Sequence, residues 1–338
     1  MLKKMLTLSL AGLMVLGMFA GCGEKAPAET TVPTEPAAEA KVLKVLTLGH
    51  SLSVDSNHMI NLVAATEGIG DYEEIKIGTL YYSGCKLSQH VQFLTENSPV
   101  YNLYMSSTQT PEKPPEILHE ITMRDAIQFE YWDIIVMHGG SGESASSANL
   151  RNGNIETIQN YVNENKYNPN AIFAWHMHWV QPADKELLAM YPYEPNGHMI
   201  SYEKYGFNRE NYFNAVLKGT SEVITTNDTF AFLIPTGTAM QNAWTSYMEE
   251  KDLHRDYAHA TDMARVMASY VWYCKLMGIE KLDAIKLDAI PKAFLKSTED
   301  KTQDRPLTDA EKAVMLESIN NALANPLQTT QSQYTEKP

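Results

Sequence analysis

Residues 44–64 read KVLTLGHSLSVDSNHMINLVA and contain a complete strand, turn and helix. The apolar residues up to Leu48 have the length and composition of a buried strand, and the polar turn Gly49-His50-Ser51 follows. A buried strand that leads directly into a helix is typical of α/β proteins with a parallel sheet. Three polar residues are candidates to cap the helix: Ser53, Asp55 and Ser56.

The same unit recurs along the chain, because four more short apolar runs alternate with stretches of helical periodicity. The predicted strands are Val42–Leu48, Ile75–Tyr82, Asp133–His138, Ala171–His176 and Phe230–Ile234. The predicted helices are Met59–Glu67, Pro115–Phe129, Ile155–Asn165, Asn208–Thr225, Ala239–Met248 and Ala260–Met277. This alternation predicts one α/β domain with a flavodoxin-like, doubly wound and mostly parallel five-stranded sheet.

In such a sheet, functional residues collect where the chain leaves each strand at its carboxyl end. Ser51 has this position after the first strand, immediately before a helix. A serine there can act as a nucleophile, and its own backbone N–H can stabilise an oxyanion. The alternative is that Gly49-His50-Ser51 is an ordinary strand-to-helix turn.

A second candidate group stands near the other end, in HRDYAHATDMARVMASYVWYCKLMG (residues 254–278). Asp256 and His259 are three residues apart at the start of a strongly periodic helix. A serine needs an imidazole base, and the imidazole needs a carboxylate that fixes its tautomer and stabilises its charged form. The alternative is that Asp256 caps the helix and His259 is a surface residue.

Taken together, these two stretches resemble the first and last sequence blocks of the SGNH (GDSL-type) hydrolases. The stretch Tyr82–Leu87 resembles the second block, in which the N–H of a glycine, here Gly84, joins that of the nucleophile in the oxyanion hole. The likeness extends to an uncharacterised branch of the superfamily found in bacterial exported proteins, through WDIIVMHGGSG, FAWHMHW, IPTGTAMQNAWTSY and NNALANPLQTTQS. It implies the SGNH hydrolase fold and a triad of Ser51, Asp256 and His259.

The third block departs from the family pattern, because Met137–Gly142 contains no asparagine to donate a side-chain amide to the oxyanion. The backbone N–H of Gly139 or Gly140, or the ring of His138, could replace that donor. His50 also stands where this branch usually has asparagine, and it either contacts substrate or packs.

Other polar and aromatic residues are candidates for substrate contact. Trp244 could stack on a sugar ring, or it could belong to the core. His176 and His178 point to the same side of a strand and could form a zinc site with His138, but their spacing is not a recognised zinc pattern. We therefore expect no metal and no other cofactor. The substrate-contact candidates are His50, His138, His176, His178 and Trp244.

The N-terminus has the features of a bacterial export signal. Two lysines precede an apolar run that is short for a membrane span, and Ala20-Gly21-Cys22 resembles a lipobox. We expect a signal peptide over residues 1–21, lipidation of Cys22 and anchoring to the outer face of a bacterial membrane. Plain secretion and an uncleaved anchor are the alternatives. The proline-rich residues 22–41 predict a disordered tether before a domain over 42–332 and a tail over 333–338.

The net charge of −14 makes nucleic acid a poor partner. Cys85 and Cys274 could form a disulfide or remain buried thiols. From the triad we predict a monomeric extracytoplasmic serine esterase. The resemblance, the exported location and aromatic loops such as Tyr191-Pro192-Tyr193 imply that it removes O-acetyl or other small acyl groups from carbohydrate. The alternative is a catalytically weak or inactive glycan-binding lipoprotein on the same fold.

Overall fold

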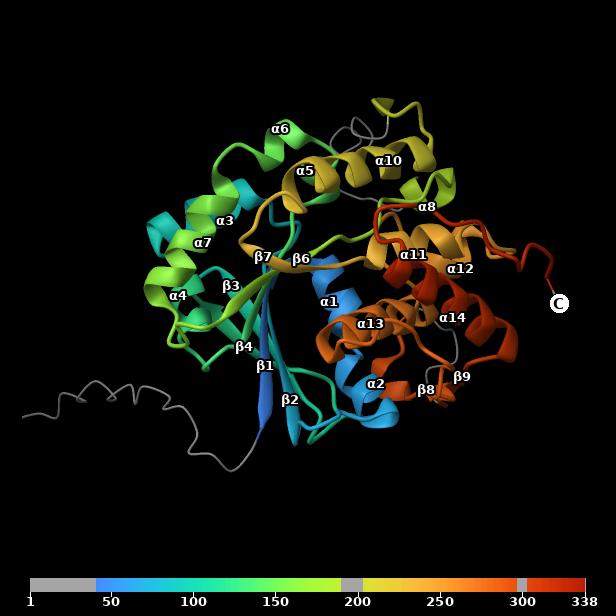
Figure 1. Cartoon of the computed structure of the whole chain (residues 1–338), viewed down its shortest axis with the longest axis horizontal. Helices are drawn as coiled ribbons and strands as arrows, with labels where there is room; N and C mark the ends of the chain where they lie inside the picture. The colour runs from blue at the N-terminus through green and yellow to red at the C-terminus, as the bar shows by residue number, and fades with distance from the viewer. Residues whose placement is uncertain (1–40, 190–202, 297–302, 338) are drawn as a thin grey trace, which may run out of the picture. The chain divides into compact units, whose positions relative to one another are not determined.

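The five apolar runs form five parallel strands of one sheet in the computed structural model, in the order β2-β1-β5-β6-β7 (Figure 1). This order, with the first strand inside the sheet and the chain winding outward to both sides, confirms the predicted doubly wound, flavodoxin-like fold class. The structure describes residues 41–189, 203–296 and 303–337. The parallel strands are β1 (Val42–Gly49), β2 (Glu74–Tyr81), β5 (Ile134–Met137), β6 (Ile172–His176) and β7 (Phe230–Ile234).

The sheet has seven strands, because an antiparallel hairpin extends it beyond β2. Its strands are β3 (Tyr101–Ser107) and β4 (Glu116–Ile121). The predicted helix Pro115–Phe129 is therefore wrong over its first half and is replaced by β4, whose backbone groups pair with β3. Only a short helix, α4 (Met123–Ile127), follows, and Thr122 caps it by accepting the N–H of Asp125.

Helices cover both faces of the sheet, and Figure 1 shows them as two groups. On one face lie α3 (Leu87–Glu96), α4 and α7 (Asn154–Asn165). On the other lie α1 (Ser51–Asn57), α2 (Ile60–Glu67), α11 (Thr236–Ala243), α13 (Asp262–Met277) and α14 (Asp309–Ala324). The remaining elements are α5 (Ser141–Ser144), α6 (Ser147–Leu150), α8 (Lys185–Ala189), α10 (Arg209–Gly219), α12 (Glu250–Leu253), a π turn (Thr220–Ile224), a 3₁₀ turn (Lys292–Phe294), β8 (Ala289–Ile290) and β9 (Arg305–Pro306).

Helix α13 is the centre of the second group, in contact with α1, α2, α11 and α14. Every residue from Asp262 to Cys274 is buried, so the helix is enclosed on all sides over this length. Cys274 is a buried free thiol, as is Cys85, and burial raises the pKa of Cys274 to about 12. The two cysteines therefore do not form the disulfide that the sequence left open.

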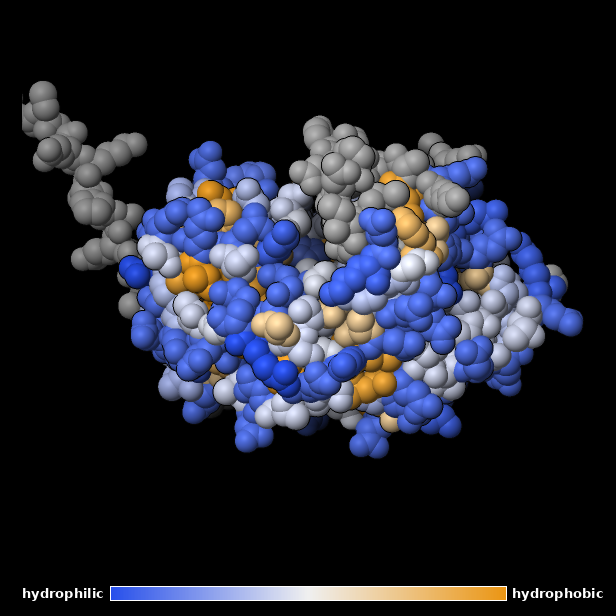
Figure 2. All heavy atoms as spheres, turned by 90° about the horizontal axis from the view of Figure 1, so that it is seen from above, coloured by the Kyte–Doolittle hydropathy of each residue, from blue (hydrophilic) through white to orange (hydrophobic). Residues whose placement is uncertain are grey.

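The predicted signal peptide, Cys22 and residues 22–40 of the predicted tether lie outside the described residues, as does Tyr191-Pro192-Tyr193. Within the described part of the chain, no helix is both long and apolar enough to cross a membrane. Figure 2 views the molecule from the top of Figure 1, where α5, α6 and α10 lie. That face is mostly hydrophilic, with small apolar patches between the polar side chains.

Candidate active site

Ser51 is the first residue of α1, directly after β1, and it is half-buried. The helix is capped by His50, whose Nδ1 accepts the N–H of Leu52 (3.2 Å). The three predicted caps lie instead inside α1, because the helix begins earlier than the sequence indicated. The N–H of Ser51 has no acceptor among the described residues. A backbone donor at a helix N-terminus is suited to stabilise a developing negative charge.

The turn before Ser51 requires glycine. A Cβ atom on Gly49 would collide with Ser53 Oγ and with His138 Nε2. These two atoms are hydrogen-bonded to each other across the turn, 2.5 Å apart. The contact joins α1 to the loop after β5 and fixes the position of the helix start.

Asp256 and His259 are hydrogen-bonded to each other through both backbone and side chain, just before the start of α13. One carboxylate oxygen of Asp256 accepts the backbone N–H of His259 (2.8 Å) and of Ala258 (2.9 Å), and both oxygens lie about 3 Å from Nδ1 of His259. Burial alone would raise the pKa of Asp256, but these bonds outweigh it and lower the pKa to about 2. The carboxylate is therefore ionised at neutral pH and holds the proton of His259 on Nδ1, which leaves Nε2 as a base.

Asp55 attaches this pair to α1. Its buried carboxylate accepts the N–H of Ala260 (3.0 Å), the residue after His259, and forms an ion pair with Arg255 (3.0 Å). Ser51 and Asp55 are four residues apart on α1 and thus lie on the same face of the helix. The Asp256–His259 turn is therefore held against the helix that begins with Ser51. No hydrogen bond joins the Ser51 hydroxyl to a described residue; catalytic bonds of this kind often tighten only when substrate binds.

The candidate oxyanion donors differ in availability. Gly84 has φ +60° at the third position of a turn closed by the Cys85 N–H and the Tyr82 carbonyl, a position that favours glycine. Its N–H and that of Gly139 have no acceptor among the described residues. The N–H of Gly140, in contrast, donates to Glu143 Oε2 (3.2 Å). Of the two glycine donors left open by the sequence, Gly139 is the available one.

Glu143 is a residue that sequence reasoning missed. Its Oε2 also accepts the N–H of Leu87 (3.0 Å), so one carboxylate links the loop after β5 to the loop after β2. Burial raises the pKa of Glu143. A glutamate three residues after Gly140 at a helix start was the available signal, since acidic residues are favoured in first turns.

The four predicted substrate-contact histidines are almost completely buried, with 0–5% of each residue exposed. His176 Nε2 lies 2.6 Å from Thr236 Oγ1, and His178 lies between two backbone carbonyls. Nitrogen atoms of His50, His138 and His178 lie within 4.8 Å of one another. These rings therefore pack together beneath the carboxyl edge of the sheet.

Trp244 is also buried, with 6% exposed. Its indole stacks on His254, with ring centroids 5.1 Å apart, and the guanidinium of Arg209 lies over it. Trp244 therefore packs as a core residue, which was one of the two roles that the sequence left open, and its ring has no face exposed for stacking on a sugar.

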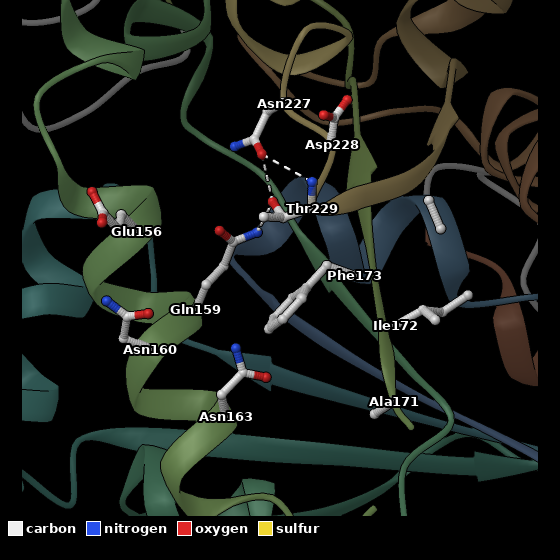
Figure 3. Close-up of a pocket in the computed structure, with 11 residues that line it drawn as sticks. Glu156, Gln159, Asn160, Asn163, Ala171, Ile172, Phe173, Asn227, Asp228 and Thr229 are labelled. Carbon is white, nitrogen blue, oxygen red and sulfur yellow. Dashed lines mark hydrogen bonds between the residues drawn. The ribbon is translucent and has the colours of Figure 1, made fainter. Parts of the chain in front are cut away.

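A separate cavity of about 610 Å³ lies at the amino ends of β6 and β7, at the edge of the sheet opposite Ser51. Figure 3 shows amide side chains of α7, among them Gln159 and Asn163, facing Phe173 across it. Gln159 donates to Thr229 Oγ1 (2.8 Å). None of the predicted site residues lines this cavity.

A family model described as "Domain of unknown function (DUF4886)" matches residues 44–292. Among solved structures, the chain is similar to a DUF4886 family protein from Bacteroides uniformis ATCC 8492, with 20% identity and a TM-score of 0.69 over 88% of this chain and 100% of that one. This likeness shows the fold.

Two other solved structures are similar at lower TM-scores. One is a candidate SGNH hydrolase from Slackia heliotrinireducens (TM-score 0.43, 15% identity, 70% of this chain and 100% of that one). The other is the salicylyl-acyltransferase SsfX3 from a tetracycline biosynthetic pathway (0.34, 12%, 72% and 57%). No curated protein matches the sequence.

Proposed function

The chain belongs to the DUF4886 family, and from the site geometry we propose that it is a serine hydrolase of the SGNH type that cleaves carboxylic esters. One observation carries the proposal: the ionised Asp256 orients His259 as a base, and Asp55 fixes this pair to the helix that begins with Ser51. Acid, base and hydroxyl stand at the carboxyl edge of the sheet, where doubly wound folds bind ligands.

In the proposed reaction, Ser51 Oγ attacks the ester carbonyl carbon while Nε2 of His259 accepts the hydroxyl proton. The tetrahedral intermediate then breaks its bond to the leaving alcohol, and His259 returns the proton to that alcohol. Water attacks the acyl-Ser51 ester in the same way, releases the carboxylic acid and restores the serine. Asp256 stabilises the imidazolium that forms in each half-reaction.

We assign the oxyanion to three backbone donors, the N–H groups of Ser51, Gly84 and Gly139. The third takes the place of the side-chain amide that the sequence lacks. This assignment is supported by the hydrogen bond from the Gly140 N–H to Glu143. Because that N–H is already bonded, the N–H of Gly139 is the available donor in the loop after β5. One donor of this kind contributes about 3–4 kcal/mol to transition-state stabilisation.

We further propose that the substrate carries an O-acetyl or other small acyl group on a carbohydrate, and that the protein works outside the cell, anchored by a lipid on Cys22. The N-terminal sequence pattern supports the location. The mostly hydrophilic surface on the side of α5, α6 and α10 is compatible with a polar substrate (Figure 2).

The test is acetate release from a chromogenic acetyl ester and from acetylated xylan by the purified full-length protein. We expect Ser51→Ala to lower kcat by about 10⁶-fold, with a small residual rate from the backbone oxyanion donors. Ser88→Ala, an exposed serine on α3, is the matched control and should keep full activity. If the folded wild-type protein releases no acetate but binds the glycan, the non-catalytic glycan-binding alternative is correct.

A further inference from the structure

Three of the buried histidines bring together the ends of three strands. His50 follows β1, His138 follows β5, and His178 lies two residues beyond β6. Their ring centroids are 4.3 Å apart for His50 and His138, 5.4 Å for His138 and His178, and 5.5 Å for His50 and His178. Each ring is at most 5% exposed, and no carboxylate is among their hydrogen-bond partners in the described residues.

The hydrogen bonds of these rings show which nitrogens carry a lone pair and what occupies each one. Nδ1 of His138 lies 3.3 Å from the carbonyl of Gly139, and Nδ1 of His178 lies 2.7 Å from that of Trp179. Donation from Nδ1–H to a carbonyl leaves Nε2 as the lone pair, which is the usual arrangement in metal-binding histidines. In His138 this lone pair accepts the hydroxyl of Ser53 (2.5 Å), so a metal ion would displace that hydroxyl. Nδ1 of His50 accepts the Leu52 N–H, so a metal ion bound there would replace this bond.

His178 has one contact more than a neutral ring can satisfy. Its Nε2 lies 2.6 Å from the carbonyl oxygen of Gly139, while Nδ1 already faces Trp179. A neutral imidazole has one N–H, so one of these contacts places two lone pairs against each other. A cation bound by Nε2 of His178 and the Gly139 oxygen would replace this repulsion by attraction.

We propose that His50, His138 and His178, with the carbonyl of Gly139, bind one divalent transition-metal ion of the zinc class. Imidazole nitrogen is a preferred ligand of such ions, whereas Mg²⁺ and Ca²⁺ require several oxygen ligands, of which this cluster offers one. The ligand nitrogens lie within 4.8 Å of one another. Zn–N bonds of about 2.0–2.1 Å in a tetrahedral site need ligand atoms about 3.4 Å apart. The nitrogens must therefore close by up to about 1.4 Å, whereas Nε2 of His178 and the Gly139 oxygen, 2.6 Å apart, must separate.

The ion would tie together the loops that follow β1, β5 and β6. It would hold the Gly139 peptide, whose N–H we assign as the third oxyanion donor, and this role rests on the proposed function. Metal binding itself does not, because the serine mechanism involves no metal.

The test uses the untagged full-length protein, stripped of metal with a chelator and then titrated with Zn²⁺ by calorimetry. We expect one ion per chain. Zinc X-ray absorption of the wild-type complex should show nitrogen ligands at about 2.0–2.1 Å with imidazole scattering. A chain that binds no Zn²⁺, or a first shell without imidazole, would overturn the proposal, and neither outcome depends on how any variant folds.

Variants identify the ligands. His178→Gln and His138→Gln should each weaken Zn²⁺ binding by at least roughly 10–100-fold. That is the usual loss when a residue that only hydrogen-bonds to a metal ligand is replaced, and loss of a ligand itself costs at least as much. His119→Gln is the matched control, since His119 is exposed on β4 and bonded to Asn102. Unchanged affinity in both folded cluster variants would also overturn the proposal. Ser51→Ala should bind Zn²⁺ normally even though it is inactive, which separates this test from that of the esterase.

Discussion

His259 and His138 both lie at the carboxyl edge of the sheet, but their surroundings differ in charge and in access to solvent. His259 is partly exposed, and a carboxylate with a pKa near 2 faces its Nδ1. His138 is buried among other imidazoles, and burial holds its pKa well below the ordinary value. The comparison teaches that the residue type does not define a general base. A charged hydrogen-bond partner and access of the ring to solvent define it.

The largest expected difference between the two is in turnover. His259→Gln should lower kcat by about 10⁵–10⁶-fold, and because it removes the bond to Asp256 it should lower the free energy of unfolding by about 1 kcal/mol. His138→Gln should instead lower the free energy of unfolding by about 1–3 kcal/mol through its buried bond to Ser53. Ester kinetics and urea denaturation measure both quantities. Equal losses of kcat in the two variants would contradict the assignment of His259 as the base.

Asp256→Asn tests the charged partner by itself. The amide retains an oxygen for the backbone N–H groups, but its NH₂ group favours the wrong tautomer of His259, and we expect kcat to fall by about 10⁴-fold. Asp283→Asn, at an exposed aspartate, is the control and should have wild-type kinetics. A fall of less than tenfold in Asp256→Asn would mean that His259 works without this carboxylate.

Asp55→Asn tests how the pair is held. The variant leaves Arg255 without its buried counter-charge, and breaking such a pair costs about 3–5 kcal/mol. We expect this loss in urea denaturation together with a lower kcat at temperatures where the variant is folded. Stability equal to that of the wild type would show that Asp55 does not anchor the turn.

The smallest predicted effect is on acid stability. The folded-state pKa of Asp256 is lowered from 3.8 to about 2, so its stabilising contribution is present above about pH 4 and is lost as the pH falls toward 2. The free energy of unfolding of wild type and Asp256→Asn should therefore differ by about 2 kcal/mol at pH 6 and converge near pH 2. A difference that is the same at both pH values would rule out this linkage.

Strands β1 and β5 could be predicted because both of their faces are covered and their sequences are largely apolar. β7 is partly exposed, but its sequence FAFLI is apolar throughout. The hairpin was missed because most of the residues of β3 and β4 are half-buried or exposed, and their sequences contain no such apolar run. Helix α14 was also not predicted. It packs against one side of α13. Its position depends on contacts with α11 and α13, which cannot be predicted from the local sequence.

In the candidate site, Ser51, Asp256 and His259 could be selected from the sequence because each carries a reactive group near a predicted helix start. Asp55 looked like one of three helix caps, and its partner Ala260 is 205 residues away. Glu143 similarly acts on Leu87, at a separation of 56 residues. Partners at such distances are brought together only by the tertiary fold.

The hairpin also determines what kind of edge the sheet presents to other molecules. β4 lies at one end of the strand order, where its outer backbone groups have no strand beside them. Its exposed glutamates, Glu116 and Glu120, carry like charge, and Glu120 has a left-handed backbone (φ 55°). The pairing of β4 with β3 is also irregular in register. A charged and bent edge is a poor template for another strand, so β4 protects the sheet against growth into aggregates.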